Sequence, residues 1–169
     1  MQTLPIKRLD RELIERIATQ ARQSPRLRQT YSFHDRSDKV QRFINILQPG
    51  TYVRPHRHCR DGGINGFEFF LVCQGALGML VMNDRGEIVT TEFVSAGGTV
   101  WGLELPEATY HTAVALAPDT IILELKEGPY NSSTDKEFLE EFPAEGTDAA
   151  QQLVATWETY FQRTVISDR

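Results

Sequence analysis

The segment that most constrains the fold of this chain is 50–75, which reads GTYVRPHRHCRDGGINGFEFFLVCQG. It carries His56 and His58, and since residues i and i+2 of a β-strand point to the same face, their imidazoles should face one point. Glu68 follows in an aromatic run, where a carboxylate is costly to bury without a partner. His111, in the later segment LPEATYHTAVAL, offers a third imidazole. Three imidazoles and a carboxylate suit a borderline divalent metal such as zinc, iron, nickel or manganese.

The spacing of these residues resembles the two sequence motifs of the cupin family. The first motif is matched by Gly50, His56, His58, Glu68 and Gly75. The second is similar to PEATYH, residues 106–111, in which Ala108 takes the usual glycine position. More narrowly, the blocks SPRLRQ, FH, VQR, PGTYVRPHRH and KEGPY resemble the WbuC-type cupin metalloproteins over residues 9–130. The resemblance implies a mainly β fold, a cupin double-stranded β-helix or jelly-roll barrel, whose metal ligands are His56, His58, Glu68 and His111.

The strand pattern of residues 40–127 agrees with such a fold. Short apolar and β-branched segments alternate with turn residues, which is typical of a sandwich or barrel. The segment NDRG, residues 83–86, predicts a hairpin turn. The expected strands are VQRFINIL, TYVRPHRH, FEFFLVCQG, ALGMLVMN, EIVTTEFVSAGG, TVWGLEL, YHTAVAL and TIILELKEG.

Helical patterns flank the strands. Residues 9–23 predict a helix with Asp10 as its N-cap. A capping-box sequence at 134–137 predicts a short helix that carries Phe138, Leu139 and Phe142 and ends at Pro143, and Thr147 is expected to cap a last helix. The aromatic face of that last helix must be covered, either by the barrel or by a second subunit. We therefore divide the chain into an N-terminal helix and connector packed on the barrel at 1–38, a cupin barrel at 39–130, and a C-terminal helical extension at 131–169.

Composition argues against several classes of protein. The chain has 169 residues, enough for one domain with a substantial core, and a net charge of −5 without the basic surplus of a nucleic-acid binder. Its two cysteines, Cys59 and Cys73, do not make a disulfide scaffold. It shows neither a secretory signal nor an apolar stretch long enough to cross a bilayer. We expect a cytoplasmic protein with no nucleic-acid or membrane partner.

Candidate ligand-binding residues lie before and beside the HxH pair. Tyr52 and Arg54 share the parity of the two histidines and are expected to point inward, although Arg54 could equally be a surface cation. The segment SPRLRQTYSFH carries Arg26, Arg28 and His34. It is either a solvated connector or a cover over the barrel mouth, whose arginines hold an anionic ligand.

The last predicted strand places two opposite charges on one face. Glu124 and Lys126 alternate with leucines, so they would pair or bind ligand if that face is internal, and would be solvated if it is external. The similarity of KEGPY to the WbuC-type sequences favours an inward Lys126.

Two functions follow from the predicted site. The first is a metal-dependent enzyme, an isomerase, epimerase or dioxygenase-type cupin, whose ion binds a substrate oxygen. The WbuC resemblance implies surface-polysaccharide (O-antigen) metabolism, a small anionic, sugar or nucleotide-sugar ligand, and a homodimer, to which the aromatic tail also points. The alternative is a non-catalytic, metal-dependent binding or sensing module, because four protein ligands could close the shell of tetrahedral zinc.

Overall fold

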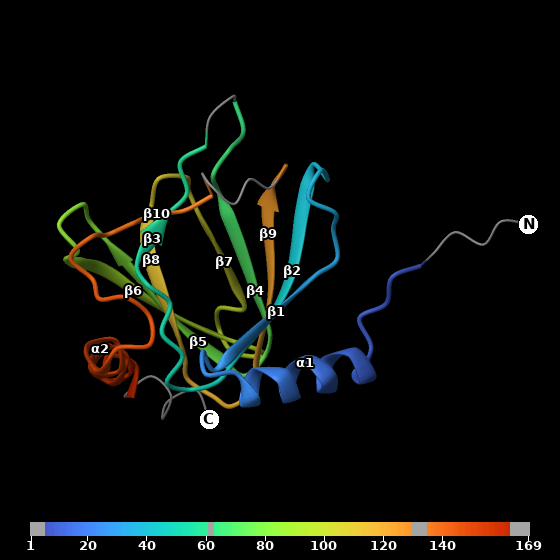
Figure 1. The fold of residues 1–169 in the computed structure, drawn as a ribbon, viewed down its shortest axis with the longest axis horizontal. Helices are drawn as coiled ribbons and strands as arrows, with labels where there is room; N and C mark the ends of the chain where they lie inside the picture. The colour runs from blue at the N-terminus through green and yellow to red at the C-terminus, as the bar shows by residue number, and fades with distance from the viewer. Residues whose placement is uncertain (1–5, 61–62, 130–134, 163–169) are drawn as a thin grey trace, which may run out of the picture.

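Two five-stranded antiparallel sheets face each other across a shared interior (Figure 1). This computed structural model describes residues 6–60, 63–129 and 135–162. The first sheet, sheet A, has the order β1 (Arg28–Ser32), β2 (Val40–Leu47), β9 (Thr120–Glu127), β4 (Glu68–Gln74) and β7 (Gly102–Leu105). The second, sheet B, has the order β10 (Glu137–Phe138), β3 (His56–Arg57), β8 (Tyr110–Ala115), β5 (Ala76–Met82) and β6 (Ile88–Ser95). The architecture is a jelly roll, as the strand pattern predicted.

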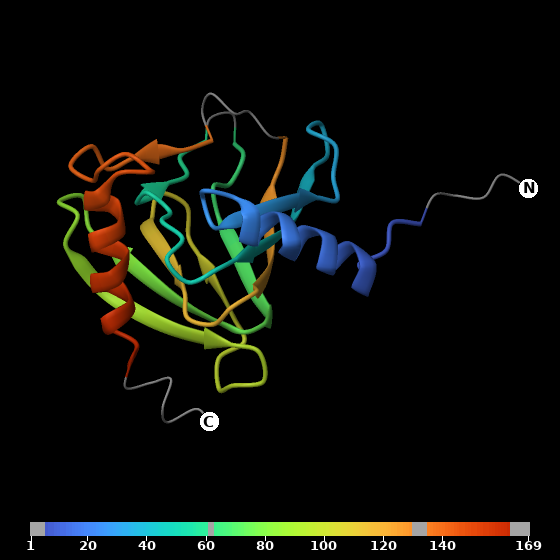
Figure 2. The same cartoon turned by 60° about the horizontal axis from the view of Figure 1, so that its bottom comes forward.

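Each sheet carries one helix on its outer side, as the two views show (Figure 1, Figure 2). Helix α1 (Arg11–Gln23) begins after Asp10, whose carboxylate accepts a hydrogen bond from the backbone N–H of Leu13 at 2.9 Å. It packs its apolar stripe on β1 and β2. Helix α2 (Asp148–Thr159) begins after Thr147, whose hydroxyl accepts from the N–H of Ala150. Both predicted N-caps are therefore confirmed.

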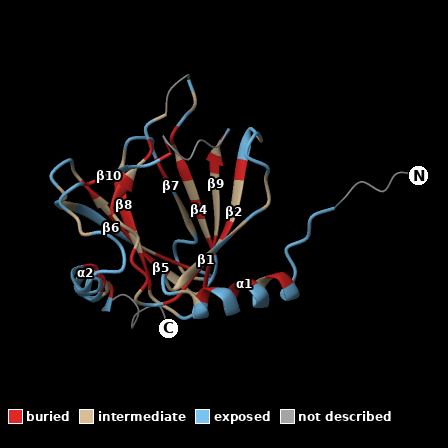
Figure 3. Ribbon diagram, in the orientation of Figure 1, coloured by how far each residue is buried: buried red, intermediate tan, exposed pale blue. Residues whose placement is uncertain are grey.

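The core divides into three clusters because both faces of the barrel wall carry apolar side chains. Figure 3 shows buried residues along the strands of both sheets and on the barrel side of α1. The cluster between the sheets contains Leu47, Phe70, Val72, Leu77, Met79, Val94, Leu105, Ala115 and Ile122. A second lies under α1, against the outward isoleucines of β2 and β9. A third joins α2 to sheet B and includes Tyr52, Trp157 and Phe161. In this structure the barrel therefore covers Trp157 and Phe161 of the last helix, whereas Tyr160 is exposed.

Most predicted strands occur as expected, but three segments differ. The stretch TYVRPHRH contains only the two-residue β3, since Pro55 has no N–H to donate to a sheet ladder. The segment predicted as a connector or cover contains β1, which forms the edge of sheet A. The short helix expected around Phe138 is wrong: Glu137 and Phe138 form β10, which pairs with β3, and the start of that capping-box sequence lies outside the described residues.

Within the described part of the chain, no helix combines the length and the apolar character needed to cross a membrane. The division of the chain at residues 38 and 130 stays a prediction, although β1 and β10, which lie beyond these boundaries, both pair with barrel strands.

Candidate metal centre

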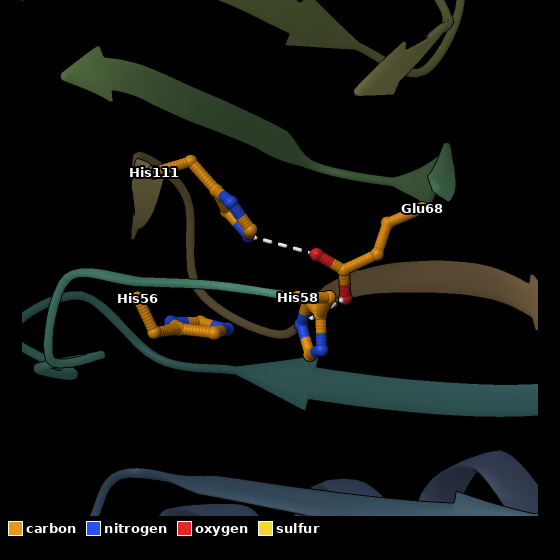
Figure 4. Close-up of side chains that lie close together, drawn as sticks. All are labelled: His56, His58, Glu68 and His111. Carbon is orange, nitrogen blue, oxygen red and sulfur yellow. Dashed lines mark ion pairs between the residues drawn. The ribbon is translucent and has the colours of Figure 1, made fainter. Parts of the chain in front are cut away.

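Four buried side chains converge inside the barrel: His56, His58, Glu68 and His111 (Figure 4). Their ligand atoms all lie within 4.8 Å of one another. The three histidines come from sheet B or the chain that leaves it, where His56 lies directly opposite His111 in the β3–β8 pair. Glu68 begins β4 in sheet A. The four groups therefore meet across the interior, from the two sheets that face each other.

Hydrogen bonds orient all three imidazoles in the same way. The Nδ1 atom of His56 lies 2.9 Å from the carbonyl of Arg54, and that of His111 lies 2.9 Å from the carbonyl of Thr109. The Nδ1 atom of His58 contacts the carbonyl of Asp135. Because a carbonyl only accepts, each Nδ1 must carry the proton, which leaves a lone pair on each Nε2 that is free to bind a metal.

These lone pairs face a carboxylate without an intervening donor. The Nε2 of His58 lies 3.1 Å from Glu68 Oε1, and the Nε2 of His111 lies 2.9 Å from Glu68 Oε2. Among the described residues, His58 Nε2 and Glu68 Oε2 have no hydrogen-bond partner. Four electron-pair donors that point at one another in a buried site repel unless a cation lies between them.

The electrostatics of the site keep the donors available. Burial lowers the pKa of His56 well below its ordinary value, and the charge of Lys136 adds to this effect, so the imidazole stays neutral. Burial acts to raise the pKa of Glu68, and the ammonium of Lys126, 3.4 Å away, acts to lower it and so favours the ionised carboxylate. A neutral imidazole and an ionised carboxylate are the forms that bind metals.

The donor set therefore fits a divalent metal ion. Three imidazole nitrogens and a carboxylate whose ligand atoms lie within 4.8 Å of one another could hold one ion. The mixture of imidazole and carboxylate suits a borderline ion and does not select one of them. The buried residues His56, His58, Glu68 and His111 could thus bind a metal, whose identity the site leaves open.

The backbone around His58 is fixed by two close contacts. The N–H of Ala108 donates to the carbonyl of His58 at 2.9 Å, and Gly66 approaches the same carbonyl so closely that a Cβ would lie 2.5 Å from it. Ala108 has φ of 61°, a conformation that glycine adopts more readily. The turn expected from the second cupin motif is therefore formed with alanine in the glycine position.

A cavity of about 350 Å³ opens beside the four converging residues. His56, Glu68 and His111 line it, whereas His58 lies outside its lining. An ion at the centre would therefore have one side turned toward this space, where a ligand oxygen or water could reach it.

Only some of the predicted ligand-binding residues line this cavity. Arg26 and Arg28 line it, and both form ion pairs with Glu145, at 3.0 Å and 2.6 Å. Lys126 points inward, as predicted, with its Nζ 3.4 Å from Glu68 and 3.1 Å from Glu124. Burial lowers the pKa of Lys126, but Glu124, Glu68 and Asp135 outweigh it and raise the pKa. Their roles in ligand binding stay predictions.

Lys126 and the other three predicted residues lie outside the cavity lining. The hydroxyl of Tyr52 donates to the carbonyl of Pro143, and its ring stacks on Trp157 at 5.8 Å. The guanidinium of Arg54 donates to the carbonyls of Leu139 and Glu140. His34 contacts the backbone of Arg42 through Nδ1. The prediction that Tyr52 and Arg54 point to the same side as the histidines is wrong, because residues 51–55 do not form a strand and their side chains do not alternate.

Several residues at the site were not predicted. Asp135 accepts from Arg60, lies 3.5 Å from Lys126 Nζ, and supplies the carbonyl to His58. No pattern in the sequence marks Asp135, since it comes from a segment expected to be helical. Asn45 lines the cavity from β2, and the alternation of VQRFINIL, which puts it on one face with Leu47, could have found it.

The two facing antiparallel sheets with flanking helices form a jelly roll of the cupin type, and the three histidines and the glutamate lie in its interior. The chain belongs to the family described as domain of unknown function DUF6016, whose model matches residues 9–94. No curated protein gives a significant match to the chain.

Solved structures with the same fold include three bacterial examples. The capsular polysaccharide assembling protein CapF from Staphylococcus aureus matches with TM-score 0.53 and 20% identity, over 66% of this chain and 31% of that chain. Oxalate decarboxylase from Bacillus subtilis at pH 4.6 matches with TM-score 0.51 and 14% identity, over 79% and 33%. A formate complex of Lactobacillus farciminis oxalate decarboxylase matches with TM-score 0.51 and 19% identity, over 79% and 38%. This chain thus spans about a third of the length of each, and the likeness concerns the fold.

Proposed function

We propose that this protein is a divalent-metal-binding cupin that acts on a small anionic or sugar-type molecule at the cavity side of the ion. One observation carries the proposal: three Nε2 lone pairs and the Glu68 carboxylate face a common point with no donor between them. When bound, the ion would polarise an oxygen of the ligand. The chain itself fixes the ligand geometry through backbone carbonyls and gives access through the cavity.

The biological setting is the less direct part of the proposal. The WbuC-type blocks in the sequence support surface-polysaccharide metabolism as that setting. The fold likeness to CapF, a capsular polysaccharide assembling protein, is compatible with it. An isomerase, epimerase or dioxygenase-type reaction fits a cavity that reaches the ion on one side. A cytoplasmic location and a homodimer belong to the same proposal.

A non-catalytic, metal-dependent binding or sensing module is the second candidate. It is favoured by the number of protein ligands, since four suffice to close a tetrahedral zinc shell and leave no position for substrate. A crystal structure of the metal-loaded protein separates the two, because an ion with one or two bound waters on the cavity side supports an enzyme.

The metal itself is tested by replacing His58 with alanine. We expect purified wild-type protein to hold about one equivalent of a divalent ion, and His58→Ala to lose it, because a missing donor weakens a four-ligand site strongly. His34→Ala is the matched control, since it removes the histidine that lies outside the cluster. Elemental analysis measures both, and undiminished metal in His58→Ala would show that the ligand assignment is wrong.

A further inference from the structure

A polar wall faces the candidate metal ligands from sheet A. Three side chains that line the cavity form it, one each from β1, β2 and β9: Thr30, Asn45 and Glu124. The hydroxyl of Thr30 donates to Asn45 Oδ1 at 2.6 Å, and Asn45 Nδ2 donates to Glu124 Oε2 at 2.6 Å. Because each contact fixes the next, the wall is ordered before any ligand arrives.

The acidic end of the wall is held in place from behind. Lys126 Nζ lies 3.1 Å from Glu124 Oε1, and the same ammonium lies 3.4 Å from Glu68. A carboxylate has about four acceptor positions. Glu124 uses two of them, for Lys126 and for Asn45, and can still accept further hydrogen bonds from a ligand in the cavity. Asn45 still has a second N–H to donate. The wall therefore offers acceptors and a donor next to each other.

This combination selects hydroxyl groups. A hydroxyl donates and accepts at once, so it can donate to Glu124 while it accepts from Asn45. An anionic group would be repelled by Glu124 and would instead be drawn to the ion or to the cations that line the cavity. Two of these cations, Arg26 and Lys136, are exposed at the edge of the cavity.

The size of the cavity limits the ligand further. A volume of about 350 Å³ lies near the lower end of the range of about 300–1,000 Å³ for ligand pockets. Such a space suits one sugar-sized ring better than a nucleotide sugar.

We propose that Thr30, Asn45 and Glu124 form a hydroxyl-binding subsite, and that the cavity takes a hydroxylated carboxylic acid of the size of one sugar ring. This inference rests on the proposed function for the placing of the carboxylate, whereas the hydroxyl contacts depend on the wall alone. Glu124 is the residue that gives the subsite its selectivity.

A pair of probes of matched shape tests the subsite. Glucuronate and cyclohexanecarboxylate both present a carboxylate on a six-membered ring, but only glucuronate carries hydroxyls. Isothermal titration of metal-loaded protein should show tighter binding of glucuronate. Glu124→Gln should weaken glucuronate by about tenfold, because hydrogen bonds to a charged group are the stronger ones. It should not weaken cyclohexanecarboxylate, which has no hydroxyl and whose anion Glu124 repels.

Two further variants keep the test interpretable. Thr30→Val removes a hydroxyl from an exposed position and should lower glucuronate affinity in the same direction, by less. Glu92→Gln removes one negative charge from an exposed position on β6 and should change neither affinity. Equal binding of the two probes by wild-type protein, no binding of either, or an equal loss of both in Glu124→Gln would overturn the subsite.

Metal analysis of the same samples separates this inference from the proposed function. If the wild-type protein holds metal but does not prefer glucuronate, the subsite fails and the metal site stands. If it takes up no metal, the proposed function fails. The subsite is then tested by whether the metal-free protein binds glucuronate more tightly than cyclohexanecarboxylate.

Discussion

Gln41 is a fully buried amide on β2 that has no hydrogen-bond partner within the described part of the chain. Burying an unpaired polar group of this kind costs about 1–3 kcal/mol. We therefore expect Gln41→Met, which keeps the volume and removes the amide, to raise the free energy of unfolding by about 1–2 kcal/mol. Urea denaturation measures the change.

The matched control for Gln41 is Gln20→Met on the exposed face of α1, which should alter stability by less than about 0.5 kcal/mol. A loss of stability in Gln41→Met, with the control unchanged, would mean that the buried amide has a partner in solution.

Asp119 links the end of α1 to the barrel through charge. It accepts from Arg22 at 3.0 and 2.7 Å and from Gln48 at 2.6 Å, and the hydrogen bond from Arg22, followed by that from Gln48, lowers its pKa against the effect of burial. A lowered pKa in the folded state means a stabilisation that is complete above the unfolded pKa of about 3.9 and is lost as the pH falls through the folded pKa.

We expect Asp119→Asn to cost less than about 1 kcal/mol at pH 7, because the pair is partly exposed. Asparagine also tolerates the φ of 50° at this position. The difference from wild type should shrink as the pH falls below the unfolded pKa of about 3.9 and vanish below the lower folded pKa. Urea denaturation across this range measures it, with Asp84→Asn, whose side chain is 86% exposed, as the control. A difference that does not depend on pH would contradict the assignment to charge.

The sequence predicts the four converging residues but not the groups that orient their side chains. His56, His58, Glu68 and His111 are recognisable because a strand alternates and because the motif spacing places them. The partners that orient them are backbone carbonyls, which every residue carries, so no residue type reveals them. The prediction that Tyr52 points to the same side as the histidines is wrong, because the chain before Pro55 is not a strand and Tyr52 packs in the cluster with α2.

At the scale of elements, the short strand β10 connects the C-terminal part of the chain to the site. It pairs with β3, and the residue that precedes it by two positions, Asp135, supplies a carbonyl to His58 and a buried carboxylate to Arg60 and Lys126. The segment therefore holds the HxH pair in place from behind.

Asp135→Ala keeps the backbone carbonyl that His58 contacts but removes the carboxylate, which lies 3.7 Å from His58 Nδ1 and pairs with Arg60 and Lys126. Because these pairs hold the segment against the site, we expect the variant to weaken metal binding by about tenfold. Competition with a chelator measures the affinity, and the absorption spectrum of cobalt-substituted protein reports whether the ligand geometry has changed. The control is Glu137→Gln, which changes a residue of β10 itself and weakens its exposed ion pair with Arg57 of β3. It should change neither the metal affinity nor the cobalt spectrum. Wild-type affinity in Asp135→Ala would show that the carboxylate does not position the site.

The elements that the sequence predicts well are those whose pattern is local. Strands β2, β4, β5, β8 and β9 alternate or run apolar between clear turns, and the turn at Asn83 closes with a hydrogen bond from Gly86 at 3.0 Å. Strand β1 carries polar side chains on the edge of sheet A, and β10 has two residues. Both are defined by their pairing partners, which are distant in sequence, so the local pattern does not show them.

At the scale of the whole molecule, α2 and the segment before it complete the core on the outer side of sheet B. Trp157 is 3% exposed and stacks on Tyr52, which lies four positions before His56. The predicted homodimer therefore does not follow from an uncovered aromatic tail, because the barrel covers that tail, and it stays a prediction based on the family resemblance alone.

Trp157→Ala should lower the free energy of unfolding by about 3–5 kcal/mol, because it opens a cavity in a packed cluster. Tyr160→Ala, which removes an aromatic ring that is 54% exposed from the end of the same helix, should stay within about 0.5 kcal/mol of wild type. Chemical denaturation of the two variants gives both values, and equal losses would mean that α2 is not seated on the barrel in solution.

The candidate ligands come from both sides of the barrel, with Glu68 on sheet A, His56 and His111 on sheet B, and His58 on the chain that leaves β3. An ion held between them would act as a cross-link that only the folded chain can form, since unfolding scatters the four groups. By mass action, the folded state then gains about 1.4 kcal/mol for each tenfold rise in free metal above the dissociation constant. The supply of metal in the cell would thereby govern how long the barrel persists as well as what it can bind.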